Sequence, residues 1–163
     1  MEPLNTKVEN RGYTIFTRMN QTQIDAVLTR ARKAVPYAIG VNNHMGSKAT
    51  ADRNTMELLT NSLKKQNLLF VDSGTSRNSL AYLLACQKGI PALKLTTYLD
   101  NPESSQTLKD KLREVVEALD GTHTAVVIGH DREETARLLS DEMARWSFQG
   151  VKFVRLNELL ENH

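Results

Sequence analysis

The fold is decided by one stretch, Tyr37-Ala38-Ile39-Gly40-Val41-Asn42-Asn43-His44-Met45-Gly46-Ser47, in which an apolar run leads directly into a cluster of polar residues. A short apolar run bounded by turn-forming residues is typical of a buried strand. A stretch of helical period precedes this run, and its apolar face carries Ile24, Val27, Leu28, Ala31 and Val35. Asn20 and Gln23 have the spacing of a capping box, which predicts that a helix begins there.

The alternation of strand and helix continues along the chain. Further apolar runs occupy residues 68–71, 92–99, 124–128 and 151–154. Helical patterns occupy residues 55–65, 78–88, 104–119, 132–146 and 156–160. Their inward faces are predicted to carry Met56, Leu59 and Leu63 in the first of these helices, and Ala136, Leu139, Met143 and Trp146 in the fourth.

This order predicts an α/β fold with a parallel sheet covered by helices, because right-handed crossovers place the helices on the faces of the sheet. Alternation by itself does not separate an open, doubly wound sheet from a barrel. The sequence shows no repeat, linker or low-complexity tract, so we expect one domain over residues 1–163.

Composition excludes several classes of protein. The 21 basic and 19 acidic residues of the 163-residue chain give a formal charge of +2 without a basic block, so nothing favours nucleic acid as a partner. No apolar stretch approaches the ~20 residues that cross a bilayer, so we expect no integral membrane protein. Met1 is not followed by the apolar core of a signal peptide. The single Cys86 excludes an internal disulfide, and we expect it to be buried in a helix.

Polar residues gather where four of the apolar runs end. Val41 leads into Asn42-Asn43-His44-Met45-Gly46-Ser47, Val71 into Asp72-Ser73-Gly74-Thr75, Leu99 into Asp100-Asn101, and Ile128 into Gly129-His130-Asp131. The carboxyl ends of parallel strands lie on one side of a sheet, so these clusters should converge there. The loops at the opposite ends of the strands are plainer, which is the asymmetry expected of an active face.

Each cluster also has a structural interpretation. Asp72 can cap the following helix, Asp100 can serve a turn with Asn101 and Pro102, and His130 can be a loop histidine. His123 and His163 are expected to be exposed and inert. Histidine with aspartate suits either metal-assisted hydrolysis or metal-free acid–base chemistry at His130, and the residues leave both open. The sequence contains no P-loop, GxGxxG or GxSxG motif.

Four of these segments resemble the motifs of the divergent polysaccharide deacetylase family. They are Val41-Asn42-Asn43-His44-Met45-Gly46-Ser47 with the preceding Val35-Pro36-Tyr37-Ala38-Ile39-Gly40, then Leu69-Phe70-Val71-Asp72-Ser73-Gly74-Thr75, Tyr98-Leu99-Asp100-Asn101 and Val127-Ile128-Gly129-His130. The resemblance implies an irregular (β/α) barrel and a hydrolase that removes acetyl groups from the N-acetylated sugars of a polysaccharide.

The resemblance also implies roles for individual residues. His44 would be a ligand of a divalent metal ion, with zinc the usual expectation, and His130 would be the general acid. Asp72 would orient a catalytic group or the substrate, and Asn42, Asn43 and Asp100 would line the substrate groove. Family members begin with a strand that ends in an Asp-Asp pair, and later carry a His-Leu-Pro-Met-Glu-Pro-like segment, whose tail Met1-Glu2-Pro3 resembles.

The first strands and the remaining metal ligands are therefore expected to lie upstream of Met1, leaving a partial barrel that is inactive or impaired on its own. Its open edge would favour a homo-oligomer. Members of the family are usually exported to the periplasm or cell envelope. Two alternatives stay open: a non-catalytic carbohydrate-binding protein of the cell envelope on the same fold, and a metal-free hydrolase or transferase on an open sheet.

Overall fold

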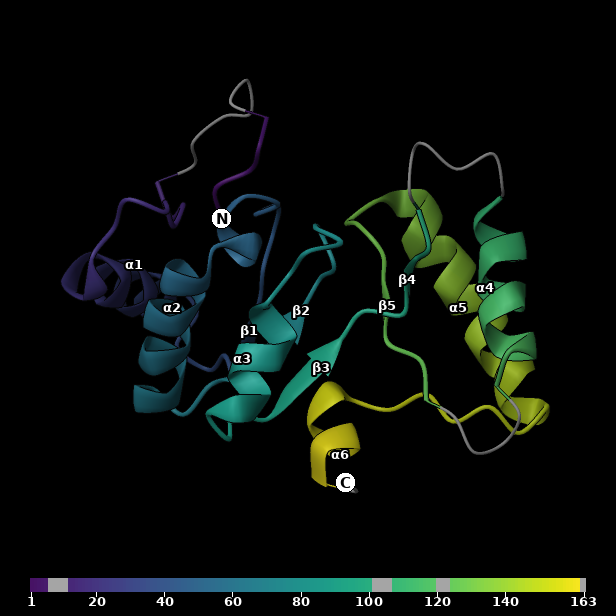
Figure 1. Cartoon of the computed structure of the whole chain (residues 1–163). Coiled ribbons are helices and arrows are strands. Elements are labelled where there is room, and N and C mark those ends of the chain that lie inside the picture. Colours follow the sequence, from purple (N-terminus) through teal and green to yellow (C-terminus); the bar gives the residue numbers. More distant parts are fainter. Residues whose placement is uncertain (6–11, 101–106, 120–123, 162–163) are drawn as a thin grey trace. The chain divides into compact units, whose positions relative to one another are not determined.

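The computed structural model describes residues 1–5, 12–100, 107–119 and 124–161. The chain divides into two compact units, Met1–Lys94 and Leu95–His163 (Figure 1). We refer to them as the first and second units and describe each by itself. The expected single domain over residues 1–163 stays a prediction.

The first unit contains a parallel sheet of three strands, β1 (Gly40–Asn42), β2 (Leu69–Asp72) and β3 (Ala92–Lys94), in that spatial order. The register pairs Val41 with Phe70 and Val71 with Leu93. Helix α2 (Arg53–Lys65) joins β1 to β2, and α3 (Ala81–Gln87) joins β2 to β3. Both helices lie on the same side of the sheet (Figure 1), as right-handed crossovers between neighbouring parallel strands require.

The helices of the first unit form where the apolar pattern predicts them. Helix α1 (Gln21–Ala34) begins with the predicted capping box, in which Asn20 and Gln23 bond each other's backbone N–H. Helix α2 begins two residues before the predicted start, because the Asp52 carboxylate accepts a hydrogen bond of 2.7 Å from the Thr55 N–H. After α3 the chain has left-handed backbone at Gly89, with φ of 67°, a conformation that glycine commonly supplies after a helix.

One apolar core fills the space between these helices and the sheet. The predicted inward residues Met56, Leu59 and Leu63 are buried in it, together with Ile15, Ile24, Val27, Leu28, Leu68, Phe70, Ala81, Leu84, Ala85 and Ile90. Two expectations were wrong. Val35 follows the end of α1 and is exposed, and Cys86 lies on the solvent side of α3.

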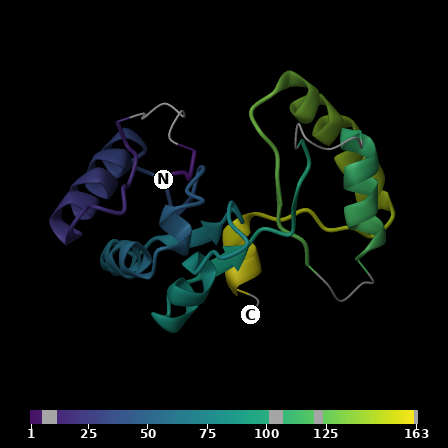
Figure 2. The ribbon, with the colours of Figure 1, turned by 45° about the horizontal axis from the view of Figure 1, so that its top comes forward.

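The second unit is smaller. The apolar run at residues 92–99 divides between the two units. Residues 92–94 form β3 of the first unit, whereas β4 (Thr97–Tyr98) pairs in parallel with β5 (Val127–Ile128) in a separate sheet. Helices α4 (Leu108–Glu117) and α5 (Glu133–Phe148) run side by side next to these strands (Figures 1 and 2). The chain ends with α6 (Leu156–Glu161).

The expected strand at residues 151–154 was wrong. This segment makes no strand ladder, and its Val151 and Phe153 instead pack against the core of the second unit. That core is centred on Leu99, Leu112 and Trp146. An apolar run can thus fill a core without having a neighbouring strand to pair with.

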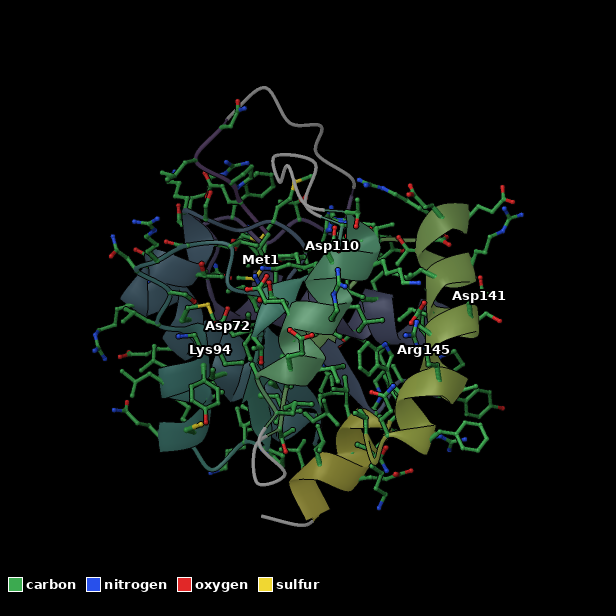
Figure 3. All side chains as sticks on the ribbon, turned by 90° about the vertical axis from the view of Figure 1, so that its right-hand side faces the viewer. Met1, Asp72, Lys94, Asp110, Asp141 and Arg145 are labelled. Carbon is green, nitrogen blue, oxygen red and sulfur yellow. The ribbon has the colours of Figure 1, made fainter. Side chains whose placement is uncertain are left out.

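The buried face of α5 also differs from the predicted one. Trp146 is buried as expected, but Ala136 and Met143 are exposed, and the polar Thr135 and Glu142 face inward. The Glu142 carboxylate forms ion pairs with Lys109 of α4 at 2.8 Å and with Arg145, labelled in Figure 3, at 3.6 Å. Specific polar partners, rather than apolar residues alone, therefore set the rotation of this helix about its axis.

Strand β1 is an edge of its sheet, with no second strand partner among the described residues. The residues before it are apolar and exposed, with Tyr37 94% and Ile39 59% accessible. Exposed apolar residues beside an open strand edge favour association. We therefore predict dimers or larger species in light scattering, and a shift toward monomer in the variant Tyr37→Lys/Ile39→Lys.

The control for this prediction is Phe148→Lys, since Phe148 is also 94% exposed but lies at the end of a helix in the second unit. The control should leave the size distribution unchanged. A wild-type chain that stays monomeric at high concentration would contradict the prediction.

Candidate functional site

The last residue of β1, Asn42, and the loop after it, with Asn43 and His44, carry three of the predicted site residues. Hydrogen bonds connect this segment to the loop after β2. Asn43 is 3% exposed; its amide nitrogen donates to the Met45 carbonyl at 3.0 Å and to the Thr75 hydroxyl at 3.2 Å. The side-chain oxygen of Asn43 accepts a hydrogen bond from the Ser73 N–H at 2.9 Å. Asn43 thus has protein partners at both ends of its amide, whereas its neighbour Asn42 is exposed and reaches the Ser73 hydroxyl at 3.1 Å.

His44 is exposed on this loop, directly before two residues with left-handed backbone. Met45 has φ of 55° and Gly46 has φ of 103°. A non-glycine residue held at positive φ costs about 1–3 kcal/mol, so the surroundings must hold it there. The Met45 carbonyl accepts hydrogen bonds from Asn43 and from the Thr75 hydroxyl at 3.0 Å, which anchors the strained turn.

Asp72 ends β2 and is 1% exposed (Figure 3 labels it). One carboxylate oxygen accepts from the Gly74 N–H at 2.9 Å, and the other from the Ser79 hydroxyl at 2.8 Å and the Tyr82 N–H at 3.3 Å. These contacts stabilise the loop and the first turn of α3. They agree with the interpretation of Asp72 as a cap; its catalytic role stays a prediction.

The second unit brings Asp100 and His130 into direct contact. Tyr98 pairs with Ile128 in the parallel ladder, and Asp100 and His130 each follow two residues later. The His130 ring Nδ1 lies 2.8 Å from one Asp100 oxygen, and the His130 backbone N–H donates to the other at 2.7 Å. The Asp100 side chain is 2% exposed, whereas that of His130 is 43% exposed. A buried carboxylate therefore holds an accessible imidazole.

Three further residues surround this pair. The Thr135 hydroxyl donates to Asp100 at 3.1 Å, and Arg132 donates to the Asp100 backbone carbonyl at 3.3 Å. The Tyr98 ring stacks on the His130 ring, with centroids 6.0 Å apart and planes at 14°. A Cβ on Gly129 would lie 2.6 Å from the Thr135 methyl carbon. The glycine before His130 is thus required for close packing of this loop on α5.

The pKa of Asp100 reflects two opposing effects. Burial raises the pKa of the carboxyl, but hydrogen bonds from the His130 ring and backbone and from Thr135 outweigh it and bring the pKa below its ordinary value. Because the folded-state pKa is the lower one, this carboxylate stabilises the fold above about pH 4, near the ordinary Asp pKa, and the contribution is lost as pH falls through the folded value. Asp100 is therefore ionised beside His130 at neutral pH.

The described residues do not by themselves make a metal site. Among them, no group of three His, Cys, Asp or Glu side chains is placed to hold an ion. His44 is accessible, but both oxygens of Asp72 in the neighbouring loop already have protein donors. The same part of the chain has no helix with the length and apolar character to cross a membrane.

The predicted residues thus fall in two groups. Asn42, Asn43, His44 and Asp72 lie at or just after the ends of adjacent strands of the first unit, and Asp100 and His130 follow adjacent strands of the second. Convergence of all four strand ends stays a prediction, and Asn101 and His123 lie outside the described residues. The sequence analysis missed Thr135 and Arg132. Thr135 lies one helical turn before Leu138 and Leu139 on α5, and this spacing would have placed it on the inward face of the helix.

Comparison with known proteins identifies the family. A family model described as divergent polysaccharide deacetylase matches residues 1–160. The uncharacterized protein YibQ of Escherichia coli K12 is 30% identical over 139 residues, which cover 85% of this chain and 43% of YibQ. An uncharacterized protein of Haemophilus influenzae is 31% identical over 140 residues, 85% of this chain and 49% of its own length.

A solved structure shows the same fold. The crystal structure of an uncharacterized protein from Agrobacterium tumefaciens C58 matches with a TM-score of 0.86 at 20% identity, over 97% of this chain and 65% of that one. The expected α/β architecture, with parallel strands alternating with helices as in part of a barrel, is confirmed. The chain spans less than half of the two curated relatives and about two-thirds of the solved protein. On the match of residues 1–160, this chain belongs to the divergent polysaccharide deacetylase family.

Proposed function

We propose that this chain supplies the acid–base centre of a carbohydrate-active hydrolase, which removes acetyl groups from the N-acetylated sugars of a polysaccharide. The observation that carries the proposal is the contact of accessible His130 with buried Asp100, in a chain of a deacetylase family. Hydrolysis of an acetamide requires a proton for the departing amine, and a positioned imidazole can deliver it.

The geometry gives His130 the properties of such a group. The ionised carboxylate of Asp100 accepts a hydrogen bond from Nδ1–H and fixes the orientation of the ring, which leaves Nε2 as the ring nitrogen for exchange with the substrate. Tyr98 stacks on the ring and limits its rotation. Asp100 is too deeply buried to line a groove, so we assign it to positioning His130 rather than to substrate contact.

For the first unit by itself, we propose that polar residues at the ends of β1 and β2 bind sugar. Asn42 is the more accessible of the two amides, whereas Asn43 and Asp72 hold the loops in place. His44 is the side chain that a divalent metal ion, zinc in the first instance, would take as a ligand. Since the described residues do not complete such a site, we draw no catalytic step through a metal.

A second function fits the same fold. A carbohydrate-binding protein of the cell envelope could keep the fold without the chemistry, because a fold by itself does not fix the function. Acetate release by the chain would favour the hydrolase.

Activity should depend on the His130–Asp100 pair. We predict acetate release from an N-acetylated oligosaccharide, reduced about 10²–10⁴-fold in His130→Ala, the range of a lost general acid. Asp100→Asn should also lower the rate, because an amide can turn its NH₂ group toward Nδ1 and no longer fixes the orientation and tautomer of the ring. His123→Ala is the control and should stay within about twofold of wild type. Full activity in His130→Ala would remove the acid–base assignment. Because a partial barrel is expected to be inactive or impaired, an inactive wild type would not by itself favour the binding protein.

Metal binding should be weak and should centre on His44. We predict that calorimetric zinc titration gives an affinity far below that of a site with three protein ligands, and that His44→Ala abolishes the signal. The variant His123→Ala should titrate like wild type. Tight binding that survives His44→Ala would exclude this residue from the metal site.

A further inference from the structure

The segment Met1-Glu2-Pro3-Leu4, whose role the proposed function leaves open, lies directly on the loop that carries His44. The Met1 nitrogen donates to the His44 carbonyl at 2.8 Å, and the Leu4 N–H donates to the Ser47 hydroxyl at 2.9 Å. The Lys48 and Ala49 N–H groups both donate to the Glu2 carbonyl, at 3.2 and 3.1 Å. In Figure 1 the amino-terminal end of the chain accordingly lies beside the turn into η1 (Ala49–Ala51).

The side chain of Glu2 joins this segment to two others. One carboxylate oxygen is 2.7 Å from the Lys48 ammonium nitrogen. The other accepts from the Thr17 N–H at 2.7 Å and from the Thr17 hydroxyl at 2.9 Å. The Glu2 side chain is 16% exposed, and its own backbone N–H donates to the Ile15 carbonyl at 2.9 Å. The Glu2 carboxylate therefore joins Thr17 to Lys48, and backbone hydrogen bonds of residues 1–4 add Ile15 and the loop 44–49.

The charge of Glu2 is stable over the range in which the protein would work. Hydrogen bonds from Lys48 and from the Thr17 backbone lower the pKa of Glu2 to about 2, against the opposing effect of burial. The carboxylate is thus ionised at any pH near neutrality, so its contacts with Lys48 and Thr17 do not depend on pH in that range.

The loop that this carboxylate anchors is the strained one. Met45 and Gly46 have left-handed backbone, and a Cβ on Gly46 would lie 2.7 Å from the Met1 Cβ, so the two chains are in close contact. Strained backbone persists only where its surroundings hold it. Asn43 and Thr75 bond the Met45 carbonyl of this loop, and the Glu2 carbonyl accepts from the Lys48 and Ala49 N–H groups at its end.

We propose that Glu2 is a positioning residue for His44: its carboxylate fixes residues 1–4 on the loop 44–49 and thereby sets where the exposed imidazole lies. The importance of this position for chemistry rests on the proposed function. The positional effect itself is measured without substrate or metal, so either proposal can fail while the other stands.

The test is NMR on the whole chain in Glu2→Ala, with Glu57→Ala as the control, since Glu57 forms an exposed pair with Arg53 at 3.4 Å. In Glu2→Ala we expect the His44 ring resonances to move. Amide exchange of Thr17, Lys48 and Ala49 should quicken about tenfold or more. The amides of Phe70 and Leu84, which bond Pro91 and Leu80 in the unit's interior, should stay within about twofold of wild type, and Glu57→Ala should change none of these signals.

A second variant keeps the test decisive if Glu2→Ala does not fold. Lys48→Met removes the ion pair but keeps the Thr17 contacts, so it should move the His44 resonances while Lys48→Arg restores them. Unchanged His44 resonances in a folded Glu2→Ala, or in Lys48→Met, would overturn the proposal. So would equal acceleration of all amides, because Glu2 would then act on global stability alone.

Discussion

Parallel pairing of neighbouring strands is the constraint on which both groups of candidate residues depend, one group in each unit. The pairing of Asn42 with Val71 makes the loops after β1 and β2 leave the sheet at the same edge, where Asn43 can bond Ser73. The pairing of Tyr98 with Ile128 does the same for Asp100 and His130. Neighbouring strands are about 4.8 Å apart, so side chains in equivalent positions after the strand ends lie within bonding range. The strand order thus places residues that are far apart in the sequence close together in the fold.

Two buried aspartates lie near the carboxyl ends of strands and differ in their contacts: Asp72 ends β2, and Asp100 lies two residues after β4. Asp72 binds donors from its own loop and from the start of α3, all within ten residues along the chain. Asp100 binds the ring and backbone of His130 and the hydroxyl of Thr135, thirty and thirty-five residues away. The first set of contacts stabilises a turn. The second holds a titratable ring that stays accessible, which is why His130 rather than Asp72 carries the proposed chemistry.

The glycines near the two candidate histidines, Gly129 and Gly46, are explained by backbone conformation and close packing. Gly129 is needed because Thr135 packs against its Cα, and Thr135 in turn binds Asp100. Gly46 has a left-handed backbone and lies against Met1. A side chain at either position would displace the loop that carries the adjacent histidine. The motifs Ile-Gly-His and Asn-Asn-His-Met-Gly therefore describe packing as much as chemistry.

The sequence by itself determined the α/β class, the parallel strands, the capping box of α1 and the inward face of α2, because periodicity and capping are local properties. It also located the residues at the strand ends. Only the tertiary structure decided that residues 92–99 divide between two sheets, that residues 151–154 form no strand, and that α5 turns Thr135 and Glu142 inward. These outcomes depend on partners far along the chain, Val127 for β4, Lys109 for Glu142 and Asp100 for Thr135, which no local pattern specifies.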